Sequence, residues 1–121
     1  MATLRIPIDA IPQARPRVTK FGHSYDPPKC KRFKENFATL VKALKRDEFF
    51  TGNLAVALKI YRNFSKPTHN NFGDVDNLAK GILDACNGIL WTDDRFIVDL
   101  HVQKFVTDVK PFVILEVTAM G

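Results

Sequence analysis

The sequence has few of the residues that build disulfide frameworks and zinc sites. Its two cysteines, Cys30 and Cys86, stand alone, with no Cys-x-x-Cys pair and no histidine at the spacing of a zinc ligand. We therefore expect two reduced thiols and neither a structural zinc ion nor a disulfide bond. The glycine-rich phosphate loop and the Gly-x-Ser-x-Gly elbow are also missing, which argues against nucleotide hydrolysis and acyl transfer.

Long apolar runs are missing too. No segment approaches the roughly 20 apolar residues that a membrane helix needs, and the first 20 residues carry charges among prolines where a secretory signal would be apolar. We expect a cytoplasmic protein without a membrane segment. A length of 121 residues with 45% hydrophobic residues suits one folded domain over residues 1–121.

The charge of the chain is unevenly distributed. Residues 1–66 hold 14 Lys and Arg against 5 Asp and Glu, whereas residues 67–121 hold 4 against 8. The basic half suits a polyanion such as nucleic acid, while the acidic half would repel the same partner. A bound divalent cation would compensate that repulsion, because it places positive charge where carboxylates meet phosphate. A solvated acidic face is the structural alternative.

Hydrophobic periodicity predicts an α+β domain with two main helices packed on a mixed β-sheet. Proline at position 7 places the first strand at a sheet edge. The order of the strands is not deducible from the pattern. The expected elements are a strand over residues 4–8, a basic hairpin over 17–25, an amphipathic basic helix over 28–46, a strand over 53–62, a helix over 75–89, and strands over 96–102 and 113–117.

Two carboxylates and a lysine cluster where the second helix begins. Asp74 and Asp76 are two residues apart and converge only if Asp74 lies before the helix, in extended or N-cap conformation. Lys80 stands one turn after Asp76, so its ammonium group can share a phosphate with the carboxylates. In the structural alternative, Asp74 caps the helix and Lys80 pairs with Asp76 and Asp84 in a surface ladder.

A second acidic pair, Asp93 and Asp94, follows this helix and opens the next strand. Paired acids are poor strand formers, so a solvated turn or cap is the structural explanation. Together the two clusters offer hard oxygen ligands, which suit Mg²⁺ or Mn²⁺ better than zinc. This composition fits phosphodiester hydrolysis.

The run Asp74-Val75-Asp76-Asn77-Leu78-Ala79-Lys80, then Asp84, then Trp91-Thr92-Asp93-Asp94, resembles the signature Asp-x-Asp-Asn-x-x-Lys…Trp-x-Asp-Asp of RusA-type Holliday junction resolvases. The resemblance extends over about residues 73–104, and residues 14–17 look like a segment of the phage and prophage members. It implies a RusA-like fold and an endodeoxyribonuclease that resolves four-way DNA junctions by paired symmetric nicks, with Mg²⁺ as cofactor and Mn²⁺ as a possible substitute.

The same resemblance assigns roles to residues. Asp74, Asp76 and Asp94 fall on the three metal-binding acidic positions of the family, Lys80 falls on its functional lysine, and Asp93 is a possible auxiliary ligand. It also implies a homodimer, which the near two-fold symmetry of a four-way junction favours independently. Two alternatives stay open: a non-catalytic DNA-binding protein, and a nuclease for other branched DNA such as flaps or forks.

Phosphate contacts are expected from the basic half of the chain, where they would position the DNA arms without reading their sequence. For any one of these cations a solvated surface position is an equal alternative. The candidates are Arg15, Arg17, Lys20, Lys29, Lys31 and Lys34.

Helix geometry raises a question about Asp94. A helix from Asp76 to about Asn87 carries the chain roughly 16 Å away, and few residues remain to bring Asp94 back. One hypothesis is that Asp94 completes the site of the partner subunit.

Overall fold

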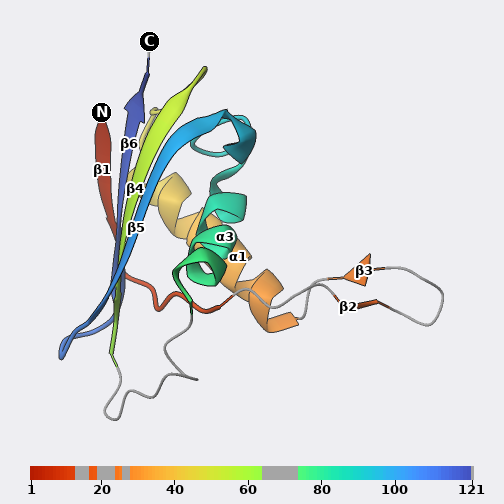
Figure 1. Ribbon diagram of the computed structural model, residues 1–121, viewed down its shortest axis with the longest axis vertical. Coiled ribbons are helices and arrows are strands. Elements are labelled where there is room, and N and C mark those ends of the chain that lie inside the picture. Colours follow the sequence, from red (N-terminus) through yellow and green to blue (C-terminus); the bar gives the residue numbers. More distant parts are fainter. Residues whose placement is uncertain (13–16, 19–23, 26–27, 64–73, 121) are drawn as a thin grey trace.

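The computed structural model describes residues 1–12, 17–18, 24–25, 28–63 and 74–120. Its elements, in chain order, are β1 (Ala2–Ile6), β2 (Arg17–Val18), β3 (Ser24–Tyr25), α1 (Pro28–Leu44), β4 (Leu54–Arg62), α3 (Val75–Cys86), a 3-10 turn η1 (Asp94–Phe96), β5 (Ile97–Val106) and β6 (Phe112–Ala119). Both α-helices of the described residues lie on one face of a four-stranded sheet, and the β2–β3 pair projects away from it (Figure 1). The α+β prediction is confirmed.

The sheet has the order β1-β6-β4-β5. β6 pairs antiparallel with both β1 and β4, while β5 pairs parallel with β4, so the sheet is mixed. The register aligns Leu4, Leu115, Leu58 and Val102 in one row across all four strands. Because side chains alternate along a strand, this row and its neighbours place the apolar residues on the helix-covered face.

The core lies between that face and the two helices. Phe33, Phe37 and Val41 of α1 are buried, as are Leu78 and Ile82 of α3. These positions recur three or four residues apart, which is why each helix presents one apolar stripe to the sheet. Trp91, in the turn that follows α3, is fully buried in the same core. No helix among the described residues is long and apolar enough to cross a membrane.

The edge strand β5 is covered less well than the rest of the sheet. Leu100 is 43% exposed and Val98 is 58% exposed. Leu100 and Val102 pair with Val56 and Leu58 of β4, which are buried, so β5 directs apolar side chains to the helix side of the sheet. α3 reaches this strand only in part, and an apolar strip of β5 is left open to solvent.

The opposite face of the sheet carries a row of stacked rings. Tyr61 stacks on Phe105 at 4.9 Å between ring centroids and on Phe112 at 4.4 Å. The guanidinium group of Arg5 lies 4.2 Å from the Phe112 centroid. Such cross-strand contacts hold neighbouring strands in register.

The sequence-predicted elements differ from the structure mainly at their ends. α3 ends at Cys86, three residues before the predicted end, and Gly88 then takes a φ of +77°, a left-handed conformation that suits glycine. The first strand ends at Ile6, before Pro7. Phe96, expected in a strand, lies in the 3-10 turn, because the carboxylate of Asp93 caps that turn. The predicted hairpin is present at its two ends, β2 and β3, and residues 19–23 lie outside the described residues.

Candidate active site

The start of α3 holds the first acidic pair. Asp74 occupies the N-cap position with an extended backbone, and its carbonyl oxygen accepts the first helical hydrogen bond, from the amide of Leu78 at 2.9 Å. Its side chain makes no capping hydrogen bond and is exposed. The Asp76 carboxylate, in the first turn, accepts a hydrogen bond from the amide of Asn77 at 2.9 Å. Asp74 therefore lies before the helix, as the spacing predicts, with its carboxylate available.

The turn after α3 positions the second acidic pair. The Asp93 carboxylate accepts a hydrogen bond from the amide of Arg95 at 2.9 Å and so caps η1, the 3-10 turn that begins with Asp94. One oxygen of Asp93 is engaged in this contact. Asp94 is partly buried at the start of the turn. Asp93 thus has a local structural role, while Asp94 has its carboxylate beside α3.

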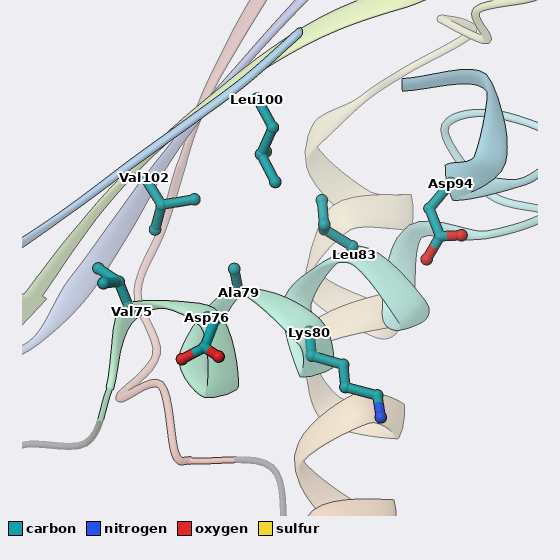
Figure 2. Close-up of a pocket in the computed structure, with 8 residues that line it drawn as sticks. All are labelled: Val75, Asp76, Ala79, Lys80, Leu83, Asp94, Leu100 and Val102. Atoms are coloured by element: carbon teal, nitrogen blue, oxygen red, sulfur yellow. The ribbon is translucent and has the colours of Figure 1, made fainter. Parts of the chain in front are cut away.

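A pocket of about 440 Å³ brings residues of both acidic segments together. Asp76 and Lys80 line it from α3, and Asp94 lines it from beyond the helix end. Figure 2 shows Asp76 near the beginning of α3 and Asp94 beside its far end, with Lys80 between them along the helix. The apolar wall of the pocket consists of Val75, Ala79, Leu83, Leu100 and Val102.

The Asp94 carboxyl lies among other acids. Partial burial raises its pKa above the usual value, and the negative charges of Asp84 and Asp93 raise it further. The nearby side-chain amide of Asn87 acts in the opposite direction on this pKa and favours the ionised form. Asp84 itself pairs with Lys34 of α1, with 3.6 Å between the ammonium nitrogen and a carboxylate oxygen. Negative charge is concentrated at this end of the pocket.

The surface-ladder interpretation does not match this geometry. Within the described part of the chain no ion pair joins Lys80 to Asp76 or Asp84, and Asp84 pairs with Lys34 instead. Lys80 is exposed at the pocket instead. The ammonium group is therefore available to a ligand of the pocket.

The described acidic side chains do not form a complete metal-binding site. Among the residues that the structure describes, no group of three or more Asp, Glu, His or Cys side chains lies close enough to hold a metal ion. The hypothesis that α3 separates Asp76 from Asp94 agrees with their places at its two ends (Figure 2). Asp76 and Asp94 nevertheless line the same pocket of a single chain. Residues of both acidic segments therefore meet at this pocket without a carboxylate from a partner subunit.

The expected DNA-contacting cations are only partly described. Lys29 and Lys31 are exposed on α1, whereas Lys34 is half-buried and pairs with Asp84. Arg17 belongs to β2, and its side chain is not described. Arg15 and Lys20 lie outside the described residues.

Of the two neighbours of Asp94 beside the pocket, the sequence singled out Asp84 but not Asn87. Asp84 continues the helix face of Asp76 and Lys80 at a further spacing of four residues, a signal that the sequence does contain. Asn87 carries no such signal. Its side chain comes near Asp94 only through the turn that follows α3.

Comparisons with known proteins show the family of the chain. The model of the family described as "Endodeoxyribonuclease RusA" matches residues 7–118. A protein of Bacillus subtilis (strain 168), described as "Uncharacterized protein YqaN", is 31% identical over 119 residues, and the match covers 83% of this chain and 84% of the relative. The matched range contains both acidic segments and the helix between them. The chain therefore belongs to the RusA family of endodeoxyribonucleases, hydrolases that act on branched DNA.

Proposed function

We propose that this protein resolves four-way DNA junctions by paired symmetric nicks in a reaction that depends on Mg²⁺. The observation that carries the proposal is the shared pocket of Asp76, Lys80 and Asp94 in a chain of the RusA family. The enzyme would work in the cytoplasm, on junctions that arise in DNA recombination or DNA repair.

The residues around the pocket suit a hard divalent cation. The donors are carboxylate oxygens, which Mg²⁺ and Mn²⁺ prefer. The pKa of Asp94 is raised by burial and by the charges of Asp84 and Asp93, so a cation would relieve an existing repulsion. We assign Asp74, Asp76 and Asp94 as ligands, with Asp93 as an auxiliary whose one oxygen already caps η1. The bound cation would polarise the scissile phosphate and lower the pKa of an attacking water.

Lys80 and the basic surface complete the proposed reaction. The ammonium group of Lys80 would stabilise negative charge on the phosphate as the 3′ oxygen leaves, which gives 5′-phosphate and 3′-hydroxyl products. Arg15, Arg17, Lys20, Lys29, Lys31 and Lys34 would hold the phosphates of the DNA arms.

The open strip of β5 suits a second copy of the chain. A long edge strand with exposed apolar side chains is a template for pairing with another strand, and β5 has ten residues, with Val98 and Leu100 exposed. A two-fold dimer uses the same surface on both copies. Pairing through this edge would place two pockets on one assembly, which a junction that needs two nicks requires.

The direct test is cleavage of a labelled synthetic four-way junction with Mg²⁺, beside a linear duplex, a flap and a fork. We expect paired nicks in the junction. Asp76→Asn and Asp94→Asn should each lower the rate on the order of 100-fold or more, because each removes part of the charge that holds the cation. Lys80→Met should slow cleavage by on the order of 100-fold while junction binding persists.

A matched control is Asp108→Asn, which removes an exposed carboxylate in the turn between β5 and β6, away from the pocket. It should cleave as the unchanged protein does. Equal loss of activity in this control, or cleavage without added divalent cation, would refute the assigned metal site. Faster cleavage of flaps or forks would make those structures the substrate.

A further inference from the structure

The pocket between α3 and β5 is larger than a metal site requires. Its volume is about 440 Å³, within the range of about 300–1,000 Å³ that is usual for pockets that bind small organic ligands. A water molecule takes up only about 30 Å³, so a cation with a few water ligands would leave much of this space vacant. The pocket therefore has room for an organic part of the substrate beside a phosphate.

The wall of the pocket consists of two apolar stripes. Val75, Ala79 and Leu83 follow one another at intervals of four residues and so lie on one side of α3. Leu100 and Val102 stand two residues apart on β5 and therefore point to the same face of the sheet. Figure 2 shows Leu83 and Leu100 extending from the helix and from the strand into the same space. Aliphatic side chains neither bind a cation nor donate to a phosphate, so this wall suits an apolar group.

Much of the wall is accessible to such a group. Leu100 is 43% exposed, and Val75, Leu83 and Val102 are half-buried, while the buried Ala79 forms the floor between them. Covering exposed apolar surface is favourable in water. A ligand that fits between the two stripes would gain this free energy.

Polar side chains lie directly beside the apolar stripe of α3. Asp76 and Lys80 each follow a residue of that stripe, so a polar stripe runs along the helix next to the apolar one. A phosphate held at the polar stripe is covalently joined to a nucleotide, whose base would lie within reach of the apolar wall. The arrangement of charge in the pocket thus matches one nucleotide, with the phosphate at one stripe and the base at the other.

A base can enter the pocket only where it has left the double helix. The faces of paired bases are stacked on their neighbours, and unstacking a base costs a few kcal/mol, least for a base that is already unpaired. Nucleotides at a branch point are held by pairing and stacking less firmly than those inside an arm. Branched DNA therefore offers a suitable base at lower cost than a linear duplex does.

We infer that the pocket holds the unpaired base of a nucleotide next to the scissile phosphate, packed between Leu83 of α3 and Leu100 and Val102 of β5. This inference rests on the proposed function, in which the cleaved phosphate lies at Asp76 and Lys80. The apolar wall would thereby contribute to the choice of branched DNA over a linear duplex, because it rewards a base that only a branch releases easily.

The test removes the two contacting partners separately and together. Leu83→Ala shortens the wall, and a four-way junction that lacks the base on one side of the mapped nick removes the occupant; both sides are tried in turn. On one of the two sides, each change alone should lower kcat/KM for cleavage by about 10-fold, since the loss of one methylene in an apolar pocket already costs about that much. Both changes together should cost no more than one, because the same contact can be lost only once.

Two valine variants accompany this cycle. Val102→Thr nearly keeps the shape of the wall but adds a hydroxyl group, and it should lower kcat/KM in the same direction as Leu83→Ala. Val109→Thr makes the same exchange outside the pocket, at a position 53% exposed between β5 and β6, and should cleave as the unchanged protein does. The fluorescent base 2-aminopurine, which brightens when it leaves the stack, should brighten at the same nucleotide when the unchanged protein binds in a chelator.

The proposed function fails if the unchanged protein cleaves no four-way junction. If it cleaves them, but cuts both base-free junctions at the normal rate or shows losses that multiply, no base occupies the pocket and the inference alone is overturned. A Leu83→Ala protein of monomer mass, beside a dimeric unchanged protein, would assign the wall to a second copy and would also overturn the inference. Should Leu83→Ala not fold, as shown by circular dichroism, folded Val102→Thr decides the question by the same criteria.

Discussion

Asp94, a proposed metal ligand, lies where its ionised form is unfavourable for the stability of the fold. Partial burial and the charges of Asp84 and Asp93 oppose its ionisation. A carboxyl whose pKa is higher in the folded than in the unfolded protein binds its proton more tightly when folded. The ionised form therefore destabilises the fold at pH values above that raised pKa, and the effect disappears as the pH falls and the carboxyl is protonated.

We accordingly predict that Asp94→Asn stabilises the metal-free protein at neutral pH. The gain should be below about 1 kcal/mol, the usual size of interactions between solvent-accessible charges, and it should shrink on acidification. Thermal unfolding in a chelator at several pH values measures it. Added Mn²⁺ should reverse the order, because it stabilises only the form that binds it. A metal-free Asp94→Asn variant less stable than the unchanged protein at neutral pH would contradict the electrostatic argument.

At the scale of elements, α3 links the core to the pocket. One side of the helix buries Leu78 and Ile82, while Asp76 and Lys80 on other sides line the pocket. α3 also contacts α1 and β5, so its position depends on both layers of the fold. The geometry of the pocket therefore depends on the core contacts of α3, which lie outside the pocket.

Ile82→Ala tests how much the buried side of α3 contributes to the stability of the fold. Ile82 is fully buried, and removing its outer carbons should lower the free energy of unfolding by about 2–5 kcal/mol, through lost burial and the cavity left behind. Urea denaturation measures the change. Leu44→Ala, at a position 41% exposed at the end of α1, is the control and should cost much less. Similar losses in both variants would show that α3 is not packed as described.

At the scale of the whole molecule, the sheet has two unlike edges. β1 closes one edge with a short strand of five residues, whereas β5 offers ten residues at the other edge with apolar side chains exposed. The pocket lies against this second edge, because Leu100 and Val102 of β5 form part of its wall. An assembly through β5 would therefore also influence the site.

Leu100→Lys should convert the proposed dimer into a monomer, since a lysine on an edge strand opposes pairing with a second strand. Leu100 is 43% exposed, so the fold should survive. Light scattering after size-exclusion chromatography measures the mass, and junction cleavage should change from paired to single nicks. Thr118→Lys, at an exposed position of β6, serves as the control. A Leu100→Lys protein of dimer mass would exclude this edge as the interface.

Much of the fold was predictable from local pattern. Alternation identified β4 and β6, and three-to-four-residue spacing identified α1 and α3, because these periods express which side of an element meets the core. Element ends were less predictable: Phe96 lies in η1 because the Asp93 side chain competes for a backbone amide. The roles of Asp74, Asp76, Lys80 and Asp94 remain predictions, although three of these four residues line one pocket.

The amino-acid sequence by itself determined the class of the fold, the family and the spacing of the acidic segments, since each of these depends on residues close together in the chain. Only the tertiary structure decided the strand order β1-β6-β4-β5, the exposed edge at β5 and the pocket that Asp76, Lys80 and Asp94 line together. These features depend on packing between distant segments, such as the contact of Phe50 with the turn after α3. Local pattern carries no record of such contacts, because they form only when the layers come together.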